Sequence, residues 1–307
     1  MKNPYNKIII WGLKKRYHTH RYIHQSFYET AKKLGWNVLW VEDESSNAHL
    51  IESGDLVISS RVSGKMIPEK KVFEDYALPI KDGVFYCLHN YGSVFIEKLQ
   101  PKQYIILQVY TRPVEVGTIK LDSVRFLDKT KRTLYQPWGT DLLPEEFKKP
   151  TFSTLPFIFW IGSVWDNAAH QGNKQEIEKL RAVLQKHKIR LIPLRLIPEW
   201  LSIFLIRHSR LAPAIVGNFQ REVDYLPCRA FKNISYGQLT FTNCAKFNEL
   251  LNGATVFGAT TEELVGSALK LSPSQYKEII LAQQAVIKNY TYKDSYATIF
   301  KVFEELA

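Results

Sequence analysis

The stretch that decides the fold is residues 135–165, YQPWGTDLLPEEFKKPTFSTLPFIFWIGSVW. A short apolar run ends in Pro137-Trp138-Gly139-Thr140-Asp141, a proline-rich polar connector follows, and Phe157–Ile161 then opens a new strand pattern closed by Gly162-Ser163. A connector of this kind between two apolar runs is typical of a domain boundary. The stretch therefore predicts two similar α/β halves with a cleft between them, and function is expected on the loops that face the cleft.

The composition is that of a folded protein. A length of 307 residues favours about two domains, and 45% hydrophobic with 23% charged residues argues against disorder. The net charge of +11 is compatible with nucleic acid, an anionic membrane surface or phosphorylated small molecules as partners. Because Lys and Arg are spread along the chain without a nucleic-acid-binding signature, weak attraction to anions is favoured and no nucleic-acid partner is expected.

The cysteines and the apolar stretches indicate the compartment. The three cysteines lack metal-ligand spacing and cannot all pair within one chain, which fits a reducing environment. The N-terminus lacks a signal-peptide pattern, and the most apolar stretch, residues 189–206, is interrupted by two prolines and by charged residues. We expect a cytoplasmic protein without a transmembrane segment and with peripheral membrane contact at most.

The first half reads as a series of βαβ units. Lys7–Trp11 has the continuous apolar pattern of a strand buried on both faces, a helical pattern follows up to Gly35, and Asn37–Val41 is a second strand. This order implies a parallel sheet with right-handed crossovers. Three further apolar runs are predicted strands: Asp55–Ser59, Gly83–Leu88 and Tyr104–Val109.

The loops after these strands carry the candidate residues. A GxGxxG fingerprint is missing after the first strand, which disfavours a nicotinamide or flavin enzyme. His18 and His20 follow this strand and allow three interpretations: a fragment of a metal site, a general base with a substrate hydrogen-bonder, or a polar cluster at a helix start. The last two are favoured because the sequence shows no third metal ligand at a suitable spacing. Because carboxyl ends of parallel strands meet at one edge, polar residues after four strands should converge: His18, His20, Asp43, His89, Asn90 and Arg112.

The second half repeats the α/β pattern. Predicted strands after Phe157–Ile161 are Ile189–Pro193, Ala214–Gly217, Leu239–Thr242 and Val256–Gly258. Predicted helices are Gln175–Lys186, the strongly apolar Trp200–Ile206, Glu262–Leu271 and Ser274–Leu306 with a break near Asn289-Tyr290. A final helix of this length can cross back to the first half.

A short helical segment in the second half has the chemistry of an anion site. Residues 229–236 follow a Leu-Pro pair, and their spacing places Arg229, Lys232 and Asn233 near one another. A helix N-terminus that carries an arginine binds phosphate well, because backbone donors, the macrodipole and the guanidinium act together. The alternative is a surface arginine paired with Glu222 or Asp224, and these residues leave both possibilities open.

These features together resemble the GT-B class of nucleotide-sugar glycosyltransferases. Residues 137–141 with Phe147 are similar to the hinge signature P-N-G-V-D followed by Phe, and residues 159–163 to the strand and turn where the donor phosphates are approached. Residues 229–237 are similar to the donor-binding helix, written E-A-x-A-x-G in the class. The resemblance implies an acceptor-side domain at 1–148, a donor domain at 149–290, and a C-terminal helix at 291–307 that packs on the first domain.

The chain departs from retaining members of that class. These carry a Glu-x7-Glu pair whose second Glu holds the ribose hydroxyls, and the matching positions here are Asp224 and Lys232. Lysine cannot accept those hydrogen bonds. The Arg-Ala-Phe stretch at 229–231 is instead similar to exostosin-like transferases, which are inverting, and the opening 8–43 looks like small exostosin-like proteins of bacteria and large algal viruses, some of them xylosyltransferases.

The resemblance implies transfer of a sugar from a nucleoside diphosphate, with UDP-sugars and UDP-xylose among them favoured, to a glycan hydroxyl. Inversion is favoured, and neither a metal nor a cofactor is expected. The implied donor residues are Gly162, Ser163, Arg229, Lys232, Asn233 and Tyr225; the implied catalytic residues are His20, Asp43 and His18; the implied acceptor residues are His89, Asn90 and Arg112. Alternatives are a nucleotide-sugar isomerase or epimerase of the same architecture, and a non-enzymatic two-lobed carbohydrate- or nucleotide-binding protein.

Overall fold

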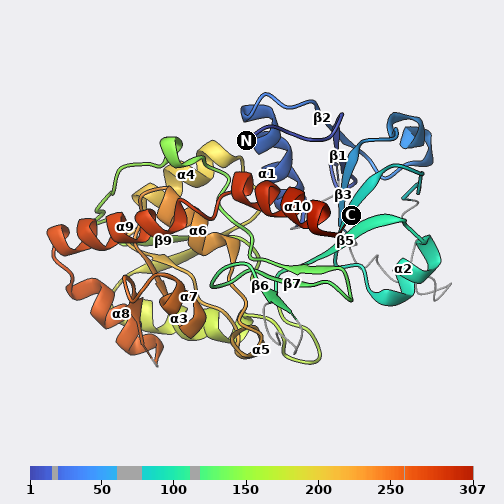
Figure 1. The fold of residues 1–307 in the computed structure, drawn as a ribbon. Coiled ribbons are helices and arrows are strands. Elements are labelled where there is room, and N and C mark those ends of the chain that lie inside the picture. The colour runs from blue at the N-terminus through green and yellow to red at the C-terminus, as the bar shows by residue number, and fades with distance from the viewer. Residues whose placement is uncertain (16–19, 61–77, 111–117, 259, 307) are drawn as a thin grey trace. The chain divides into compact units, whose positions relative to one another are not determined.

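The computed structural model describes residues 1–15, 20–60, 78–110, 118–258 and 260–306 (Figure 1). The chain divides into two compact units. Unit 1 takes in Met1–Gln108, the strands that follow up to Gln136, and the chain from Ser295 onward, whereas unit 2 holds Pro137–Asp294 together with Val109 and Tyr110. The division therefore falls inside the stretch 135–165 that predicts the domain boundary.

Unit 1 is built on a sheet of eight strands within its described part, in the order β2-β1-β3-β4-β5-β8-β7-β6. The first six in that order are parallel, and β7 and β6 form an antiparallel extension. The five predicted strands are confirmed to within two residues, and β6 to β8 were not predicted. The bounds are β1 Ile8–Trp11, β2 Val38–Val41, β3 Leu56–Ser60, β4 Phe85–His89, β5 Gln103–Gln108, β6 Ile119–Lys120, β7 Phe126–Asp128 and β8 Thr133–Tyr135.

The strand order places the functional edge of unit 1. All four residues of β1 are buried, as expected for a central parallel strand covered on both faces. The chain order reverses at β1, with β2 on one side and β3 on the other, so the ligand edge of such a sheet lies at the carboxyl ends of β1 and β3. The remaining elements of unit 1 are α1 His20–Lys33, η1 Ser45–Leu50, α2 Ser93–Leu99 and most of α10 Tyr292–Leu306.

The C-terminal helix packs on the first unit. Figure 1 shows α10, in red, beside α1, in blue, and the Tyr296 hydroxyl donates a hydrogen bond to the Phe27 carbonyl oxygen at 3.0 Å. The Tyr296 ring also contacts the rings of Phe27 and Trp36 edge-on. The predicted break in the last helical pattern is confirmed, because α9 ends at Ile287 and α10 begins at Tyr292.

Unit 2 has a similar but smaller parallel arrangement. β9 Phe157–Ile161 pairs with β10 Arg190–Leu194, and β12 Thr240–Thr242 lies between β11 Ala212–Pro213 and β13 Val256–Phe257. The Arg210 N–H donates to the Phe157 carbonyl oxygen at 2.7 Å and so links β9 to the chain entering β11. The helices are η2 Pro144–Glu146, α3 Lys174–Lys186, α4 Glu199–His208, α5 Asn218–Glu222, α6 Cys228–Ser235, α7 Ala245–Leu250, α8 Thr261–Lys270 and α9 Pro273–Ile287.

One predicted strand of unit 2 is wrong in position. The prediction placed it at Ala214–Gly217, whereas β11 is Ala212–Pro213. The Ala214 N–H still donates to the Phe241 carbonyl oxygen at 2.9 Å, but the Val216 N–H donates to the side chain of Asn243. The apolar run thus extends past the end of β11, because beyond it the side chain of Asn243 accepts the hydrogen bond that a neighbouring strand would otherwise accept.

Among the described helices, none combines the length and the apolar character needed to cross a membrane.

Candidate functional site

An arginine lies at the carboxyl end of the first strand of unit 2. Arg229, in the first turn of α6, donates from Nε to the Ile161 carbonyl oxygen at 3.0 Å. Its guanidinium carbon lies 3.6 Å from the centroid of the Trp160 ring, within the range of a cation–π contact. The pairing with Glu222 or Asp224 that sequence reasoning left open is not formed, and no carboxylate in the described chain forms an ion pair with Arg229.

Within the described part of the chain, no carboxylate therefore compensates the charge of Arg229. Burial lowers the pKa of its guanidinium to about 10, so the side chain stays protonated at neutral pH. A carbonyl oxygen and an aromatic face orient a cation but do not neutralise it. A partly buried cation without a counter-charge attracts an anion, and a planar guanidinium fits a phosphate in particular.

Gly162 makes room for this guanidinium. Its φ of +134° is a conformation that residues with a side chain rarely adopt, and a Cβ built there would overlap the Arg229 Nη2 atom. The Gly162 N–H donates to the Leu194 carbonyl oxygen at 2.9 Å, and the contact of Gly162 with a donor phosphate stays a prediction. Ser163 follows directly, and its carbonyl oxygen accepts a hydrogen bond from Asn173 Nδ2 at 3.2 Å.

Two other predicted donor residues of α6 hold unit 2 together. Lys232 Nζ lies 2.6 Å from Asp141 Oδ2, and the Tyr236 hydroxyl donates to the same carboxylate. Burial acts to lower the pKa of Lys232, but the charge and hydrogen bond of Asp141, together with nearby Cys228 and Glu199, raise that pKa overall. Asn233 is buried and donates to the Ala212 carbonyl oxygen at 3.2 Å. Their contacts with a donor molecule stay predictions, and the Lys232–Asp141 ion pair was missed.

Tyr225, the remaining predicted donor residue, belongs to an aromatic cluster. Its ring centroid lies 5.6 Å from that of Tyr110, which lies 6.4 Å from Phe219. Burial raises the pKa of the Tyr225 hydroxyl, with nearby Cys228 and Tyr110 adding to the effect. A neutral tyrosine of this kind has a ring face suited to stacking on a base or a sugar.

In unit 1 the edge predicted from strand order carries two histidines and a serine. His20 Nδ1 and His89 Nδ1 each lie 2.8 Å from the Ser60 hydroxyl oxygen, and the two rings are 4.7 Å apart. The prediction that loops after separate strands converge is confirmed for His20 and His89. Ser60 was missed because β3 was predicted to end one residue earlier, at Ser59. Its pairing opposite His89 in the β3–β4 register is what brings it to the site.

Two of the other predicted residues of unit 1, Asp43 and Asn90, lie at the ends of strands, and two are not described. A Cβ built on Gly12, at the end of β1, would lie 3.3 Å from Asp43 Cβ, so Asp43 lies at the same sheet edge. Asn90 follows His89 with a φ of +61°, and its N–H donates to the Leu107 carbonyl oxygen at 3.4 Å. His18 and Arg112 lie outside the described residues.

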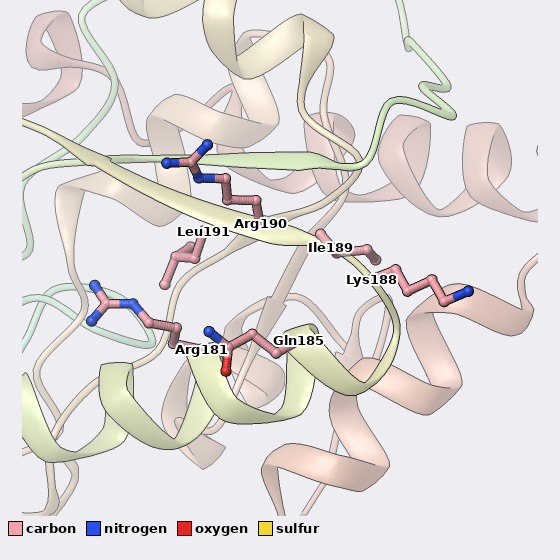
Figure 2. A pocket seen from close by; sticks show the side chains of 6 residues that line it. All are labelled: Arg181, Gln185, Lys188, Ile189, Arg190 and Leu191. Carbon is pink, nitrogen blue, oxygen red and sulfur yellow. The ribbon is translucent and has the colours of Figure 1, made fainter.

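A separate hollow of ≈ 450 Å³ lies at the opposite end of β10 from Leu194 (Figure 2). Figure 2 shows that the side chains around it come from α3, from the chain that leads into β10 and from the first two residues of β10. Three of its lining residues are cationic and none is acidic. They are Arg181, Gln185, Lys188, Ile189, Arg190 and Leu191. None of the residues predicted from sequence as functional lines this hollow.

The chain has the GT-B type of fold, since several solved structures match it along nearly its whole length. An α-glucosyltransferase in complex with UDP and a 13-mer DNA has a TM-score of 0.57 at 9% identity. The apo structure of OtsA has a TM-score of 0.54 at 10% identity, and a DNA-modifying β-glucosyltransferase studied with uridine diphosphoglucose has 0.52 at 13%. Each match covers 97% of this chain and 99% of the other.

These identities establish the fold alone. No protein-family model matches the sequence, and no curated protein matches it in sequence. One fold of this kind carries many activities, so the function depends on the residues at the two sheet edges.

Proposed function

We propose that this protein is a glycosyltransferase that moves a sugar from a nucleoside diphosphate, favouring a UDP-sugar, to a hydroxyl group of a glycan. The observation that carries the proposal is Arg229, a cation at the carboxyl end of β9 that forms no ion pair with any described carboxylate. The fold supports it, because in α/β sheets of this kind the ligand site is at the carboxyl end of the strands. One similar structure is a complex with UDP, and another was studied with uridine diphosphoglucose.

On unit 2, Arg229 would bind the diphosphate and stabilise the negative charge that develops as the bond to the sugar breaks. Gly162 contributes space for the guanidinium rather than a donor, and Ser163 supplies a hydroxyl next to it. Tyr225 is the aromatic face for the nucleobase or sugar. Lys232 and Asn233 tie α6 to Asp141 and to the Ala212 carbonyl oxygen. A direct contact between either side chain and the donor would need that side chain to exchange its present partner.

On unit 1, His20 would take the proton of the acceptor hydroxyl, as an inverting transfer requires. Asp43, at the same sheet edge, and His18 are the other candidates for this base. His89 and Asn90 follow β4 and would bind the acceptor, together with Arg112. The departure from the retaining Glu-x7-Glu pattern at Asp224 and Lys232 favours inversion.

The finer assignments rest on the sequence. These are xylose as the sugar, an exostosin-like subclass, a cytoplasmic location and independence of metal ions and cofactors. The predicted lack of a nucleic-acid partner needs its own experiment, because two of the similar structures are described with DNA or as DNA-modifying. Duplex DNA therefore belongs in the acceptor panel beside glycans.

A thermal-stability panel of nucleotide sugars tests the proposal first. At a concentration 100-fold above the dissociation constant, a bound ligand adds about 2.7 kcal/mol to the free energy of unfolding. We expect UDP and UDP-sugars to raise the melting temperature and, with an acceptor present, UDP to be released as a glycoside forms. No shift with any nucleotide would contradict the proposal, an epimerised sugar would show the isomerase alternative, and binding without turnover of any acceptor would favour the non-enzymatic one.

The His20→Ala variant tests the assignment of the base. Loss of general-base catalysis lowers turnover by about 10²- to 10⁴-fold. Because His20 lies in unit 1 and Arg229 in unit 2, the dissociation constant for UDP should not change. Unchanged turnover in this variant would exclude His20, and parallel measurements on Asp43→Asn and His18→Ala would then identify the base.

A further inference from the structure

Ser60 connects the two histidines of unit 1 through a single hydroxyl group. It is the last residue of β3 and is 7% exposed, while His89 is 3% exposed at the end of β4 and His20 is partly exposed at the start of α1. Both imidazoles approach it with the same ring nitrogen, Nδ1, at the same distance of 2.8 Å. Neighbouring Ser59 bonds elsewhere, to the Tyr91 hydroxyl at 3.0 Å.

The chemistry of a hydroxyl restricts the two rings. A serine has one proton to donate, and each neutral imidazole has one nitrogen that donates and one that accepts. If both contacts are hydrogen bonds, Ser60 donates to one Nδ1 and accepts from the other. Two neutral histidines on one serine must therefore be opposite tautomers, one with its proton on Nδ1 and the other with its proton on Nε2.

We propose that Ser60 is a positioning residue that holds His20 in the tautomer needed for a general base. In this arrangement His20 Nδ1–H donates to Ser60 Oγ, and the Ser60 hydroxyl donates to Nδ1 of His89. The lone pair of His20 is then on Nε2, the nitrogen that does not face the serine. The requirement for opposite tautomers follows from the two hydrogen bonds when both rings are neutral, whereas the choice of His20 as the ring with the basic Nε2 rests on the proposed function.

The proton balance of the transfer step fits this arrangement. The acceptor oxygen forms a bond to the anomeric carbon, and its proton moves to His20 Nε2. The bond between that carbon and the diphosphate oxygen breaks, and its electron pair leaves with UDP. His20 becomes an imidazolium that still donates from Nδ1 to Ser60, so the hydrogen bonds on both sides of the hydroxyl are kept.

The tautomers can be read from ring ¹⁵N chemical shifts of the full chain, with His20→Gln and His89→Gln used for assignment. We expect a protonated Nδ1 on His20 and a protonated Nε2 on His89. Ser60→Ala should remove this difference, Ser60→Thr should restore it because it keeps the hydroxyl, and Ser59→Ala should leave it unchanged. The same tautomer on both rings of the wild-type protein would overturn the proposal, and so would unaltered shifts in Ser60→Ala.

Turnover of a nucleotide sugar is the second readout. With the donor and acceptor found by the panel, Ser60→Ala should lower kcat at least tenfold with an unchanged dissociation constant for UDP, and Ser60→Thr should recover most of it. Equal kcat in Ser60→Ala and wild type would overturn the positioning role. If no nucleotide sugar binds, the proposed function fails while the ¹⁵N shifts still decide whether Ser60 fixes opposite tautomers.

Discussion

Gly162 decides how close the Arg229 side chain can lie to the end of β9. An alanine there would place its Cβ on the guanidinium and would strain a backbone with a φ of +134°, at a cost on the order of 1–3 kcal/mol. We expect Gly162→Ala to displace Arg229 and weaken UDP binding at least tenfold by calorimetry. Gly253→Ala is the control, since Gly253 also has a positive φ, +76°, but nothing within 4 Å of the added atom. Equal UDP affinity in both variants would show that Arg229 does not need this space.

The ion pair between Asp141 and Lys232 stabilises unit 2. Their side chains are 5% and 18% exposed, so removing one charge leaves the other partly buried without a partner. We expect Asp141→Asn to lower the free energy of unfolding by about 3 kcal/mol in urea titrations. The exposed pair Lys174–Glu178 is the control, and Glu178→Gln should cost less than about 1 kcal/mol.

The difference in unfolding free energy between the wild type and Asp141→Asn should depend on pH, because the pKa of Lys232 is raised. A base whose folded pKa is raised contributes stability that is complete below its unfolded value, here 10.5, and is lost as the pH rises through the higher folded value. The stability gap between wild type and Asp141→Asn should therefore be constant from pH 8 to 10 and shrink at higher pH. A gap that grows above pH 10.5 would mean that Lys232 is not stabilised by Asp141.

Helix α10 fixes the C-terminus to unit 1 through Tyr296, which is fully buried. Tyr296→Phe removes only the hydrogen bond to Phe27 and should cost about 1 kcal/mol, whereas Tyr296→Ala also leaves a cavity and should cost about 3–5 kcal/mol. Neither change should alter UDP affinity in conditions where the protein is folded, because Arg229 belongs to the other unit. A loss below 1 kcal/mol for Tyr296→Ala would contradict the packing of α10 on α1.

Long apolar runs made most elements predictable, and short ones did not. β1 could be predicted because all its residues are apolar and buried, which is the pattern of a central parallel strand. β7 and β8 have three residues each, too few for any periodicity to show. The position of β11 was predicted wrongly because the apolar run Ala212–Gly217 is longer than the strand it contains. The hydrogen bond from the Val216 N–H to the Asn243 side chain leaves no pattern in the run itself.

The candidate site was predictable where it depends on position along a strand and not where it depends on distant partners. His20 and His89 follow from the rule that ligands bind at the carboxyl ends of parallel strands, and Arg229 was predicted as an arginine at a helix N-terminus. The pairing of Lys232 with Asp141, 91 residues away, follows from no local pattern. Ser60 is an ordinary serine in the sequence, and only the register of β3 against β4 gives it two histidine neighbours.

Three of the chain's cationic residues line the hollow near β10. A variant with Arg181, Lys188 and Arg190 changed to Gln should bind a single-stranded oligonucleotide or heparin more weakly. The slope of the binding constant against salt concentration, on a double-logarithmic plot, should fall by the equivalent of up to about three ionic contacts. The control carries the same charge change at exposed Lys270, Lys277 and Lys288. Equal losses in both variants would mean that net charge alone attracts polyanions and that the hollow has no special role.

The central claim is that Arg229 is the diphosphate-binding cation of a nucleotide-sugar site. The most direct test is calorimetric titration of UDP into the wild type, Arg229→Ala and Arg210→Ala. Arg210 is a matched control, because it also contacts an aromatic ring, Phe152, and donates to a carbonyl oxygen, that of Ser153, yet it lies at the other end of β9. Loss of charge-assisted hydrogen bonds should weaken UDP binding about 10- to 100-fold in Arg229→Ala, with Arg210→Ala like wild type. UDP affinity in Arg229→Ala equal to that of the wild type would contradict the claim.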